Sequence, residues 1–485
     1  MNMNCNGINK IANNFMNKLI ASMVTKSEIY LVGGYIRDFF LSKESHDFDY
    51  VVVEESAIGF AKKFADYTGG YFVLLDEKYD IARVVMPDKI NHADFAACQG
   101  KDILQDLTRR DITINSMALK IGKNAELIDP MNGILDLTEK KVRLISEKNL
   151  IDDPLRALRV YRFASQLGFE IEEKTAEYVK THYKLMINIA AERIHNELIK
   201  LFEGDFTSQT LEKLKNDGLL YLIFPEIESQ KKVPPNIHHH LWLVDHSIET
   251  VRQFEKIKPS LPDWVLERLN SEHAHGIKII SLFKLACLLH DLGKPASWEI
   301  DSEGRHRFIK HDEIGAKIAE KMLKNLKFSK NQIKYISKLI KYHIYPSQLL
   351  RLEETPSEKA INRMFRKLEE ETPDIIVLAM VDRLSAQGVD ITKEITEHNI
   401  SGLNNFLEKY RNLTEHNLLA PLPKLLSGDE IAEILNIQRG PLIGKTIAKP
   451  LNIMHFGKGD YAVKWFSKDD LNNLIPAGIY FYQIR

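Results

Sequence analysis

The pattern of apolar and polar positions near the N-terminus predicts a strand, a turn, a helix and a second strand. An apolar run that ends at Val32 leads through Gly33 and Gly34 into a helical pattern that carries Arg37. Glycines let the backbone come close to a polyphosphate, helix N-termini offer free N–H donors, and an arginine adds a fixed positive charge. This arrangement predicts a triphosphate-binding turn.

The second strand brings two carboxylates to one face. Side chains along a strand alternate between faces, so Asp47 and Asp49 project together while Phe48 and Tyr50 point into a core. Neighbouring carboxylates repel each other, and a divalent cation between them relieves that repulsion. We therefore predict a site for a metal-bound nucleoside triphosphate, in preference to solvated edge acids beside an ordinary turn.

Three further segments continue the strand pattern, and they cover residues 71–75, 81–86 and 92–96. Each is rich in residues that favour strands and is bounded by Asp, Lys or Pro. Asp94 lies in the last of them. We predict that it turns toward Asp47 and Asp49 as a third carboxylate.

An arginine pair, Arg109 and Arg110, precedes a pattern that predicts an amphipathic helix. Asp111 stands where it can cap that helix. A direct contact between Asp111 and a ligand is an equally supported alternative.

Another helix is predicted after residue 153, opened by an acidic cap and a proline in its first turn. Its arginines stand three residues apart and form a row along one face: Arg156, Arg159 and Arg162. Such a row is most often a solvated face. Here Asp153 stands one turn before Arg156, and a carboxylate with a guanidinium can present acceptors and donors to the edge of a base.

The C-terminal half follows a linker rich in Lys and Pro, residues 230–235. Residues that commonly bind metals recur there in segments that otherwise predict helices: His246, His290, Asp291, His311, His343 and Asp382. Isolated histidines are usually structural or exposed, and we interpret His238, His239 and His273 in that way. The recurring set predicts a second metal site.

Composition places the chain among globular proteins. Its 485 residues are 44% hydrophobic and 27% charged, and they predict three or four domains. No apolar run is long enough for a membrane span, and the first 26 residues lack the apolar core of a secretion signal. Three scattered cysteines fit a reducing compartment, so we expect a cytoplasmic protein. With 66 basic and 67 acidic residues, any nucleic-acid contact must be local.

Six ordered motifs between residues 28 and 203 give the chain a resemblance to class II tRNA nucleotidyltransferases, the family of CCA-adding enzymes and bacterial poly(A) polymerases. The motifs occupy residues 31–38, 47–53, 109–118, 128–133, 152–163 and 191–198. The resemblance implies an α+β protein, with a DNA polymerase beta-type head followed by a helical neck. It also implies tRNA, CTP and ATP as partners, and Mg²⁺ as the cofactor of the head.

The resemblance assigns roles to individual residues. Gly33, Gly34 and Arg37 would bind the triphosphate, Arg110 would contact the nucleotide, and the paired acids of residues 47–49 would hold Mg²⁺. Asp153 and Arg156 would serve as an amino-acid template for the incoming base, with Arg159 and Arg162 lining the same pocket. Asp152 stands where the family usually has Glu. The implied chemistry is in-line attack of an RNA 3′-hydroxyl on the α-phosphate, assisted by two metal ions.

The connection between Asp94 and Arg109 is short compared with the flexible segment of about twenty residues found in many CCA-adding members of the family. That segment would help the site switch from CTP to ATP. Addition of CCA, of CC alone and of A alone therefore all stay open.

The histidines and aspartates of the C-terminal half resemble the HD phosphohydrolase superfamily, whose ligands follow the order H, HD, H, H, D. The resemblance implies one divalent metal on His246, His290, Asp291 and Asp382, with His311 and His343 available for a second ion. Ni²⁺ or Mn²⁺ suits such a site. The resemblance also places Lys294 near a phosphate and implies hydrolysis of a phosphomonoester or a cyclic phosphodiester. The alternative is a degenerate domain that holds tRNA.

These patterns divide the chain into an extension, a head, a neck, an HD domain and a helical tail: residues 1–26, 27–148, 149–228, 236–400 and 401–485. In the tail, residues 425–431 and 439–445 resemble tRNA-contacting segments of the family. Two competing functions remain, a poly(A) polymerase and a phosphohydrolase whose N-terminal half merely binds RNA.

Overall fold

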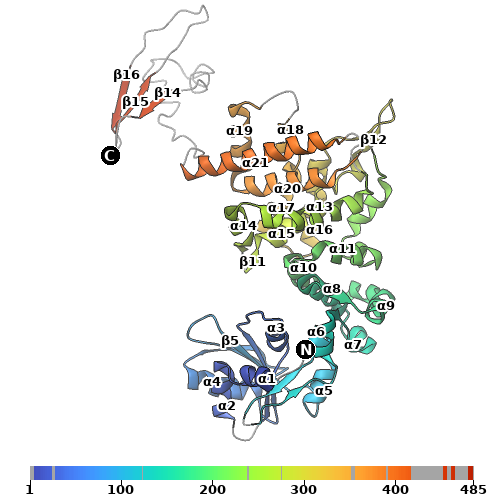
Figure 1. The fold of residues 1–485 in the computed structure, drawn as a ribbon, viewed down its shortest axis with the longest axis vertical. Helices are drawn as coiled ribbons and strands as arrows, with labels where there is room; N and C mark the ends of the chain where they lie inside the picture. The colour runs from blue at the N-terminus through green and yellow to red at the C-terminus, as the bar shows by residue number, and fades with distance from the viewer. Residues whose placement is uncertain are drawn as a thin grey trace, which may run out of the picture. The chain divides into compact units, whose positions relative to one another are not determined.

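The computed structural model describes residues 5–24, 28–122, 124–236, 240–274, 276–350, 356–388 and 391–416, together with three strands between residues 452 and 483. The chain separates into two compact units, residues 1–415 and 416–485. Figure 1 shows a mixed sheet at the N-terminal end and helices through the rest of the first unit. Each unit is described by itself.

The head contains a seven-stranded sheet in the order β3-β4-β5-β2-β1-β6-β7. Only β2 and β5 pair in parallel, and the other neighbours are antiparallel. The strands are β1 Glu28–Val32, β2 Asp47–Val53, β3 Tyr71–Asp76, β4 Ile81–Val85, β5 His92–Ala97, β6 Ala118–Lys120 and β7 Leu127–Ile128. The strands predicted for residues 71–96 are confirmed.

Helices enclose the sheet of the head: α1 Cys5–Ala12, α2 Phe15–Met23, α3 Gly34–Phe40, α4 Ala57–Thr68, α5 Ile103–Thr108 and α6 Gly133–Glu139. Phe48 and Tyr50 are buried as predicted, and Tyr50 donates a hydrogen bond to Asn17 of α2. On the opposite face, Val51 packs with Leu107 of α5. The sheet therefore has an apolar core on both faces, and the exposed end of β2 carries the acids.

The amphipathic helix expected after Arg110 is wrong. Residues Thr113–Asn115 form a single 3₁₀ turn, and the chain then enters β6, which pairs with β1. The Ser116 hydroxyl donates to the Leu107 carbonyl oxygen, and Met117 and Ala118 are buried. Pairing within the sheet outweighs the helical pattern, because it buries the apolar residues of this segment on both sides.

The neck is mainly helical: α7 Glu147–Asp152, α8 Leu155–Leu167, α9 Glu173–His182, α10 Ala191–Glu203, α11 Thr207–Asn216 and α12 Leu219–Ile223. A two-residue ladder joins β8 Lys141–Val142 to β9 Glu170–Ile171, and 3₁₀ helices follow at Tyr183–Asn188 and Pro225–Lys232. Helix α8 packs against α10. Gln230 is buried in the last 3₁₀ helix, so the predicted linker begins inside packed structure.

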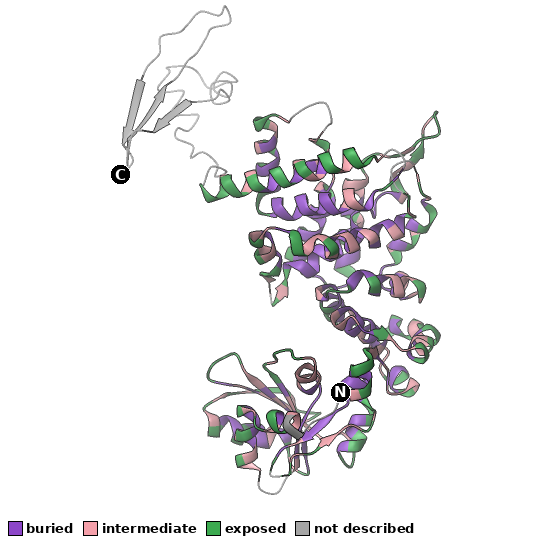
Figure 2. Ribbon diagram, in the orientation of Figure 1, coloured by how far each residue is buried: buried purple, intermediate pink, exposed green. Residues whose placement is uncertain are grey.

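The third region is built around α15 Ile279–Leu289 and α20 Thr372–Ser385, whose side chains are mostly buried (Figure 2). Around them lie α13 Leu243–Ile257, α14 Asp263–Asn270, α16 His311–Asn325, α17 Lys330–Tyr342, α18 Tyr345–Gln348, α19 Glu358–Leu368 and α21 Lys393–Glu415. Three-residue 3₁₀ turns lie at Lys258–Ser260, Pro295–Ser297 and Glu369–Glu371. Two small hairpins interrupt the helices: β10 Glu272–Ala274 with β11 Ile277–Lys278, and β12 Trp298–Ile300 with β13 His306–Phe308.

A buried lysine ties this region to the neck. Lys284 of α15 donates to the Gly204 carbonyl oxygen and lies 3.3 Å from a Glu255 carboxylate oxygen. The same carboxylate accepts hydrogen bonds from Thr207 and Ser208 at the start of α11. Burying these charges is tolerable because each one is paired and hydrogen-bonded.

The expectation of a wholly helical tail is wrong. Strands β14 Asn452–His455, β15 Asp460–Lys464 and β16 Ile479–Gln483 form a three-stranded antiparallel sheet. Helix α21 also runs through the predicted boundary at residue 400. His238, His239 and the tail segments 425–431 and 439–445 lie outside the described residues.

None of the described helices is both long enough and apolar enough to cross a bilayer. The apolar helix α15 has 11 residues, whereas a span needs about 20.

Replacing Phe95 with alanine should destabilise the head by about 3–5 kcal/mol, because a fully buried ring is lost from a packed cluster. Phe95 is 0% exposed, and its ring centroid lies 5.3–5.4 Å from those of Tyr50, Phe60 and Phe64. Hydrogen exchange of peptides from β2 and β5 measures this effect in the head alone. Tyr79→Ala, at a half-exposed ring, should leave the exchange nearly unchanged, and equal protection in both variants would contradict the packing account.

Candidate active site and metal centres

Three carboxylates converge at one end of the sheet in the head. Asp47 and Asp49 lie on β2, and the parallel register places Asp94 of β5 directly opposite Asp49. One oxygen from each acid lies within 4.8 Å of the others. The predicted grouping of the three acids is therefore present in the structure.

Two neighbours that the sequence analysis missed hold these acids in place. Arg83 of β4 forms two hydrogen bonds to Asp94, at 2.6 and 2.8 Å. His92 Nε2 lies 2.8 Å from an oxygen of Asp47. Both partners follow from strand register, Arg83 opposite Asp94 and His92 opposite Asp47, and register cannot be read from a single strand.

Burial and charge repulsion both disfavour the ionised form of Asp49. Burial, followed by the charges of Asp47 and Asp94, raises the pKa of Asp49 to about 6. Carboxylate oxygens are the ligands that Mg²⁺ prefers, and a divalent ion would offset the repulsion. The donor set therefore fits Mg²⁺, with Asp47, Asp49 and Asp94 as the residues that would hold it.

The glycine turn lies against this group. Gly33 has φ +74° and directly precedes α3, and a Cβ on it would stand 3.3 Å from an Asp49 oxygen and 3.4 Å from the Arg110 guanidinium. A side chain would be strained by the backbone conformation and would crowd the acid and the arginine. Glycine keeps the space open for a group that touches both.

The two predicted phosphate-binding arginines are oriented by partners. Arg37 donates to Asn115 at 2.7 Å and pairs with Asp38. Arg110 pairs with Asp106 at 3.0 Å. Each guanidinium has five N–H donors, so these contacts leave donors available to a phosphate.

The predicted base-reading residues of the neck meet the arginine pair of the head. Arg156 donates to the backbone carbonyl oxygens of Arg109 and Arg110, at 2.7 and 2.9 Å. One oxygen of Asp153 accepts from Arg193 at 2.9 Å, and the other is buried with no hydrogen-bond partner. An unsatisfied buried carboxylate oxygen is costly, which favours a ligand donor at this position.

Arg159 and Arg162 are engaged by acids. Arg159 pairs with Asp111 at 2.6 Å and with Glu197 at 3.1 Å, and Arg162 lies 2.5 Å from Glu197. Burial alone would raise the pKa of Asp111, but the Arg159 guanidinium outweighs it and holds that pKa below its usual value. Asp111 therefore neither caps a helix nor presents a free carboxylate; it braces the neck arginine.

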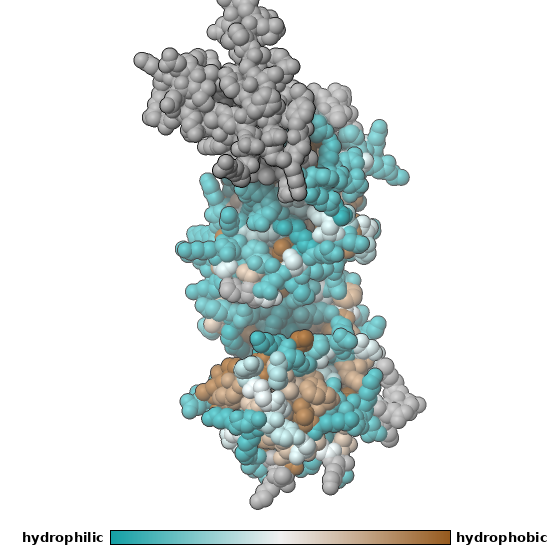
Figure 3. All heavy atoms as spheres, turned by 90° about the vertical axis from the view of Figure 1, so that its left-hand side faces the viewer, coloured by the Kyte–Doolittle hydropathy of each residue, from teal (hydrophilic) through white to brown (hydrophobic). Residues whose placement is uncertain are grey.

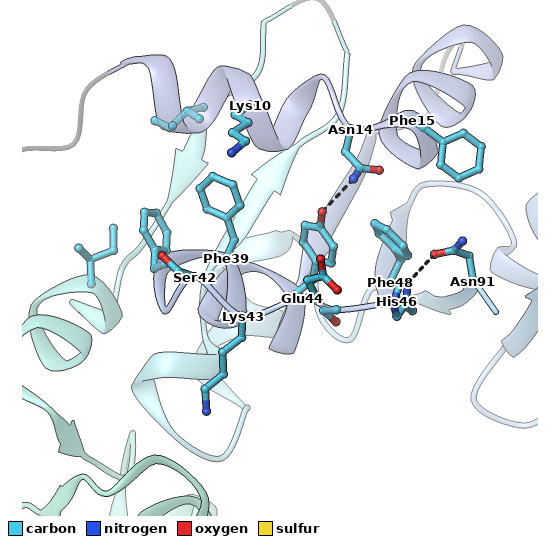
Figure 4. Close-up of a pocket in the computed structure, with 16 residues that line it drawn as sticks. Lys10, Asn14, Phe15, Phe39, Ser42, Lys43, Glu44, His46, Phe48 and Asn91 are labelled. Carbon is cyan, nitrogen blue, oxygen red and sulfur yellow. Dashed lines mark hydrogen bonds between the residues drawn. The ribbon is translucent and has the colours of Figure 1, made fainter.

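A cavity of about 810 Å³ lies beside α1 and α3, away from the carboxylates (Figure 4). Phe48 lines it, and Phe48 points to the opposite face of β2 from Asp47 and Asp49. Asn14 donates to the Tyr35 hydroxyl along its wall. The cavity therefore forms no part of the carboxylate site.

The six predicted ligands of the C-terminal half also converge. His246 comes from α13, His290 and Asp291 from the end of α15, and the remaining ligands from three other helix segments: His311, His343 and Asp382. The histidine Nε2 atoms lie 3.2–3.8 Å from carboxylate oxygens of the two acids. The atoms form three overlapping groups, two of which share Asp291, and this suits one ion or a bridged pair.

Backbone contacts orient the histidines. In three of them, Nδ1 lies 2.7–2.9 Å from the carbonyl oxygen three residues earlier: His290, His311 and His343. A donated Nδ1–H leaves Nε2 free to face the acids, as in metal-binding histidines. Gly293 permits this closure, because a Cβ there would lie 2.0 Å from the His311 carbonyl oxygen.

Titration of His290 also fits a cation. Burial alone would lower its pKa, but Asp291 outweighs burial and raises the pKa to about 10. A divalent ion can take the place of that proton between buried acids. Mixed nitrogen and oxygen donors suit Mn²⁺, Ni²⁺ or Zn²⁺ better than Mg²⁺. Lys294, which lies 2.6 Å from Asp291, adds a positive charge at the rim.

Three family profiles match the chain. They are the poly A polymerase head domain over residues 29–143, the probable RNA and SrmB-binding site of polymerase A over residues 168–231, and the HD domain over residues 243–387. The head and HD matches contain the carboxylate group and the histidine cluster, respectively.

Curated relatives match most of the chain. The A-adding tRNA nucleotidyltransferase of Deinococcus radiodurans is 30% identical, over 86% of this chain and 89% of the relative. The CC-adding tRNA nucleotidyltransferase of Thermus thermophilus is also 30% identical, over 90% of this chain and 91% of the relative.

Solved structures share the fold. The CCA-adding enzyme of Thermotoga maritima, in complex with tRNA, has a TM-score of 0.58 at 21% identity and covers 90% of this chain and 88% of its own. The α+β class, with a polymerase head, a helical region and an HD domain, is confirmed.

The raised pKa of Asp49 predicts how metal binding depends on pH. Below pH 6 the affinity of the head for Mn²⁺ should fall about tenfold per pH unit, since one proton must leave Asp49 for each ion bound. Above about pH 7 the affinity should be constant. Calorimetric titration of a His290→Ala background, which disables the helical site, measures this. Asp49→Asn should bind more weakly without that slope, and a flat wild-type profile would contradict the prediction.

Proposed function

Since this chain belongs to the family of tRNA nucleotidyltransferases, we propose that its head transfers nucleotides from CTP or ATP to the 3′ end of tRNA. The observation that carries the proposal is the three-carboxylate group with the Gly33 turn and Arg110 against it. A triphosphate placed over that turn would lie beside both the metal-binding carboxylates and the positive charge of Arg110.

The reaction joins the RNA 3′-oxygen to the α-phosphorus and breaks the bond to pyrophosphate, and the hydroxyl proton is lost. Divalent ions held by Asp47, Asp49 and Asp94 would activate the hydroxyl and neutralise the leaving group. Arg110 and Arg37 orient the phosphates. Arg83 and His92 keep the acids in position.

Base choice rests on Asp153 and Arg156. Cytosine and adenine both present an amino donor beside a ring-nitrogen acceptor, whereas guanine and uracil present a carbonyl oxygen beside an N–H. A carboxylate acceptor beside a guanidinium donor complements the first pair and opposes the second. We infer that the orphan oxygen of Asp153 accepts from the amino group and that Arg156 donates to the ring.

The connection after β5 favours addition of CC. Cys98 N–H donates to the Val52 carbonyl oxygen, Gln99 N–H donates to Asp106, and Asp102 caps α5. These bonds leave little slack for a segment that would have to move when the site changes from CTP to ATP. Addition of A alone is the second candidate, because one of the relatives carries that name.

The test is sequencing of tRNA 3′ ends after incubation with CTP, with ATP and with both. On a tRNA that lacks its three terminal nucleotides, CTP should add two residues, and a tRNA ending in CC should gain none. Adenosine on the latter tRNA would overturn CC-only addition, and a long ATP-only tail would indicate a poly(A) polymerase.

Matched substitutions test the site itself. Asp47→Asn and Asp49→Asn should each lower kcat by a factor on the order of 10³ or more, because the metal loses a charged ligand. Asp66→Asn, at an exposed acid of α4, should leave kcat unchanged. Transfer that survives both site substitutions would overturn the proposed transferase site.

We infer a second activity for the HD region, the hydrolysis of phosphomonoesters or 2′,3′-cyclic phosphodiesters at nucleotide ends. His246, His290, Asp291 and Asp382 would hold one transition-metal ion, which would supply an activated water. Lys294 stands where it can meet the phosphate. The six filled ligand positions favour an active site over a degenerate one.

The two activities should separate by mutation. His290→Ala should abolish metal-dependent hydrolysis of 2′,3′-cyclic AMP while tRNA extension continues, and Asp49→Asn should do the reverse. Phosphate release and incorporation of labelled CTP measure the two activities. A phosphohydrolase that merely binds RNA would instead keep its main activity in Asp49→Asn and show no extension in the wild type.

A further inference from the structure

Strand β3 exposes an apolar surface that neither proposed activity uses. Four of its residues are strongly exposed: Tyr71 at 59%, Val73 at 42%, and Leu74 and Leu75 at 48% each. Figure 3 shows apolar side chains gathered on this side of the head. Exposed apolar clusters of this size usually mark an interaction site.

The position of β3 in the sheet makes the exposure unusual. β3 is the terminal strand, paired with β4 on one side, and no described strand pairs with its other edge. The register places Leu74 opposite Ala82, on the face covered by α4, and Val73 opposite Arg83, on the face of the carboxylates. Apolar side chains therefore project from both faces of an edge strand.

This edge lacks the usual protection against pairing. Edge strands are commonly guarded by charged residues, prolines or bulges. Residues 71–75 contain no charge and no proline, and the register shift comes only between Leu74 and Asp76. Residues 71–74 are regular, and every second one of them offers its backbone N–H and C=O groups to another strand.

The apolar surface continues past the start of β3. Tyr71 pairs with Val85, and the next residue, Met86, lines a shallow groove together with Phe15 and Tyr67. Phe15 is 51% exposed and Tyr67 is 58% exposed. These six large side chains, four of them on β3, are each 42–59% exposed, so they offer on the order of 600 Å² per molecule, somewhat below the roughly 800 Å² that each partner buries in a standard interface.

The apolar composition of this surface indicates which kind of partner it binds. A nucleic acid needs cations to neutralise its phosphates, and residues 71–75 carry none. An apolar strand with an open edge instead fits another apolar strand. An identical strand fits best, because antiparallel pairing across a two-fold axis makes one strand its own complement.

We propose that β3 pairs with β3 of a second copy of this chain, antiparallel and centred near Val73, so that two head sheets join into one continuous sheet. Phe72 then lies opposite Leu74 of the other copy, within the regular part of the strand. The grooves lined by Phe15 and Tyr67 meet the ends of the paired strands. The carboxylate sites stay on their own sheets and need no residue from the other copy.

In analytical ultracentrifugation at micromolar concentration, the full-length wild type should have twice the mass of one chain. Leu74→Lys should raise the dissociation constant at least ~100-fold, since a charge would be buried between apolar strands. Leu104→Lys is the matched control, because Leu104 on α5 is also 48% exposed and lies away from β3. It should leave the dimer intact, and CTP incorporation should report that all three proteins are folded.

Cross-linking gives an independent measurement that does not depend on a disruptive change. Val73→Cys should form a disulfide between two chains under mild oxidation, because the two Val73 residues face each other, whereas Asp66→Cys should not. A wild type that stays monomeric at high concentration would overturn the proposal. A Leu74→Lys variant that still forms a dimer would also overturn it. If both proteins are monomers and Leu74→Lys raises the KM for tRNA, the surface binds RNA instead.

Discussion

Mutual repulsion among three carboxylates is the constraint on which the head depends. Parallel pairing of β2 with β5 fixes Asp49 opposite Asp94, and the two-residue period of the strand puts Asp47 beside them. Arg83 and His92 offset part of that charge from the sides. Burial and the remaining charge raise the pKa of Asp49, and a divalent cation would offset that repulsion. In the proposed reaction, phosphate binding and nucleotidyl transfer would depend on the position of that cation.

The chain holds two metal-type sites with different chemistry. The head offers carboxylate oxygens at the partly exposed ends of two central strands, where a hard ion and its nucleotide can enter together. The HD region offers imidazole nitrogens and two acids among packed helices, where three of the four rings are oriented by a backbone contact. Lys284 and Glu255 of the HD region bind Gly204 and the start of α11 in the neck, which also carries Asp153 and Arg156. The two metal-type sites share no ligand among the described residues.

Local rules explain what the sequence predicted well. Alternation along β2 was enough to place Asp47, Asp49, Phe48 and Tyr50 on their faces. The resemblance to the HD phosphohydrolases was enough to select six metal-type ligands from distant segments. Arg83 and His92 escaped prediction because their roles come from pairing between strands. The roles of Asp111 and Glu197 were missed for a similar reason, since each forms an ion pair with an arginine that is distant in the sequence.

The errors have a common physical origin. The segment after Arg110 has helical periodicity, yet β1 offers it a place in a sheet, and burial between strands decides its conformation. In the tail, strands formed where a helical family pattern was extended too far along the chain. In both cases contacts distant in sequence outweighed local preference, which is the part of folding that a single sequence states least directly.

The most direct test of the central claim is anomalous X-ray scattering from crystals grown with Mn²⁺ and CTP. The account predicts a peak about 2.1 Å from oxygens of Asp47 and Asp49, at ligand distance, and beside the phosphates over the Gly33 turn. Manganese found only in the histidine cluster, with CTP bound away from the acids, would contradict it.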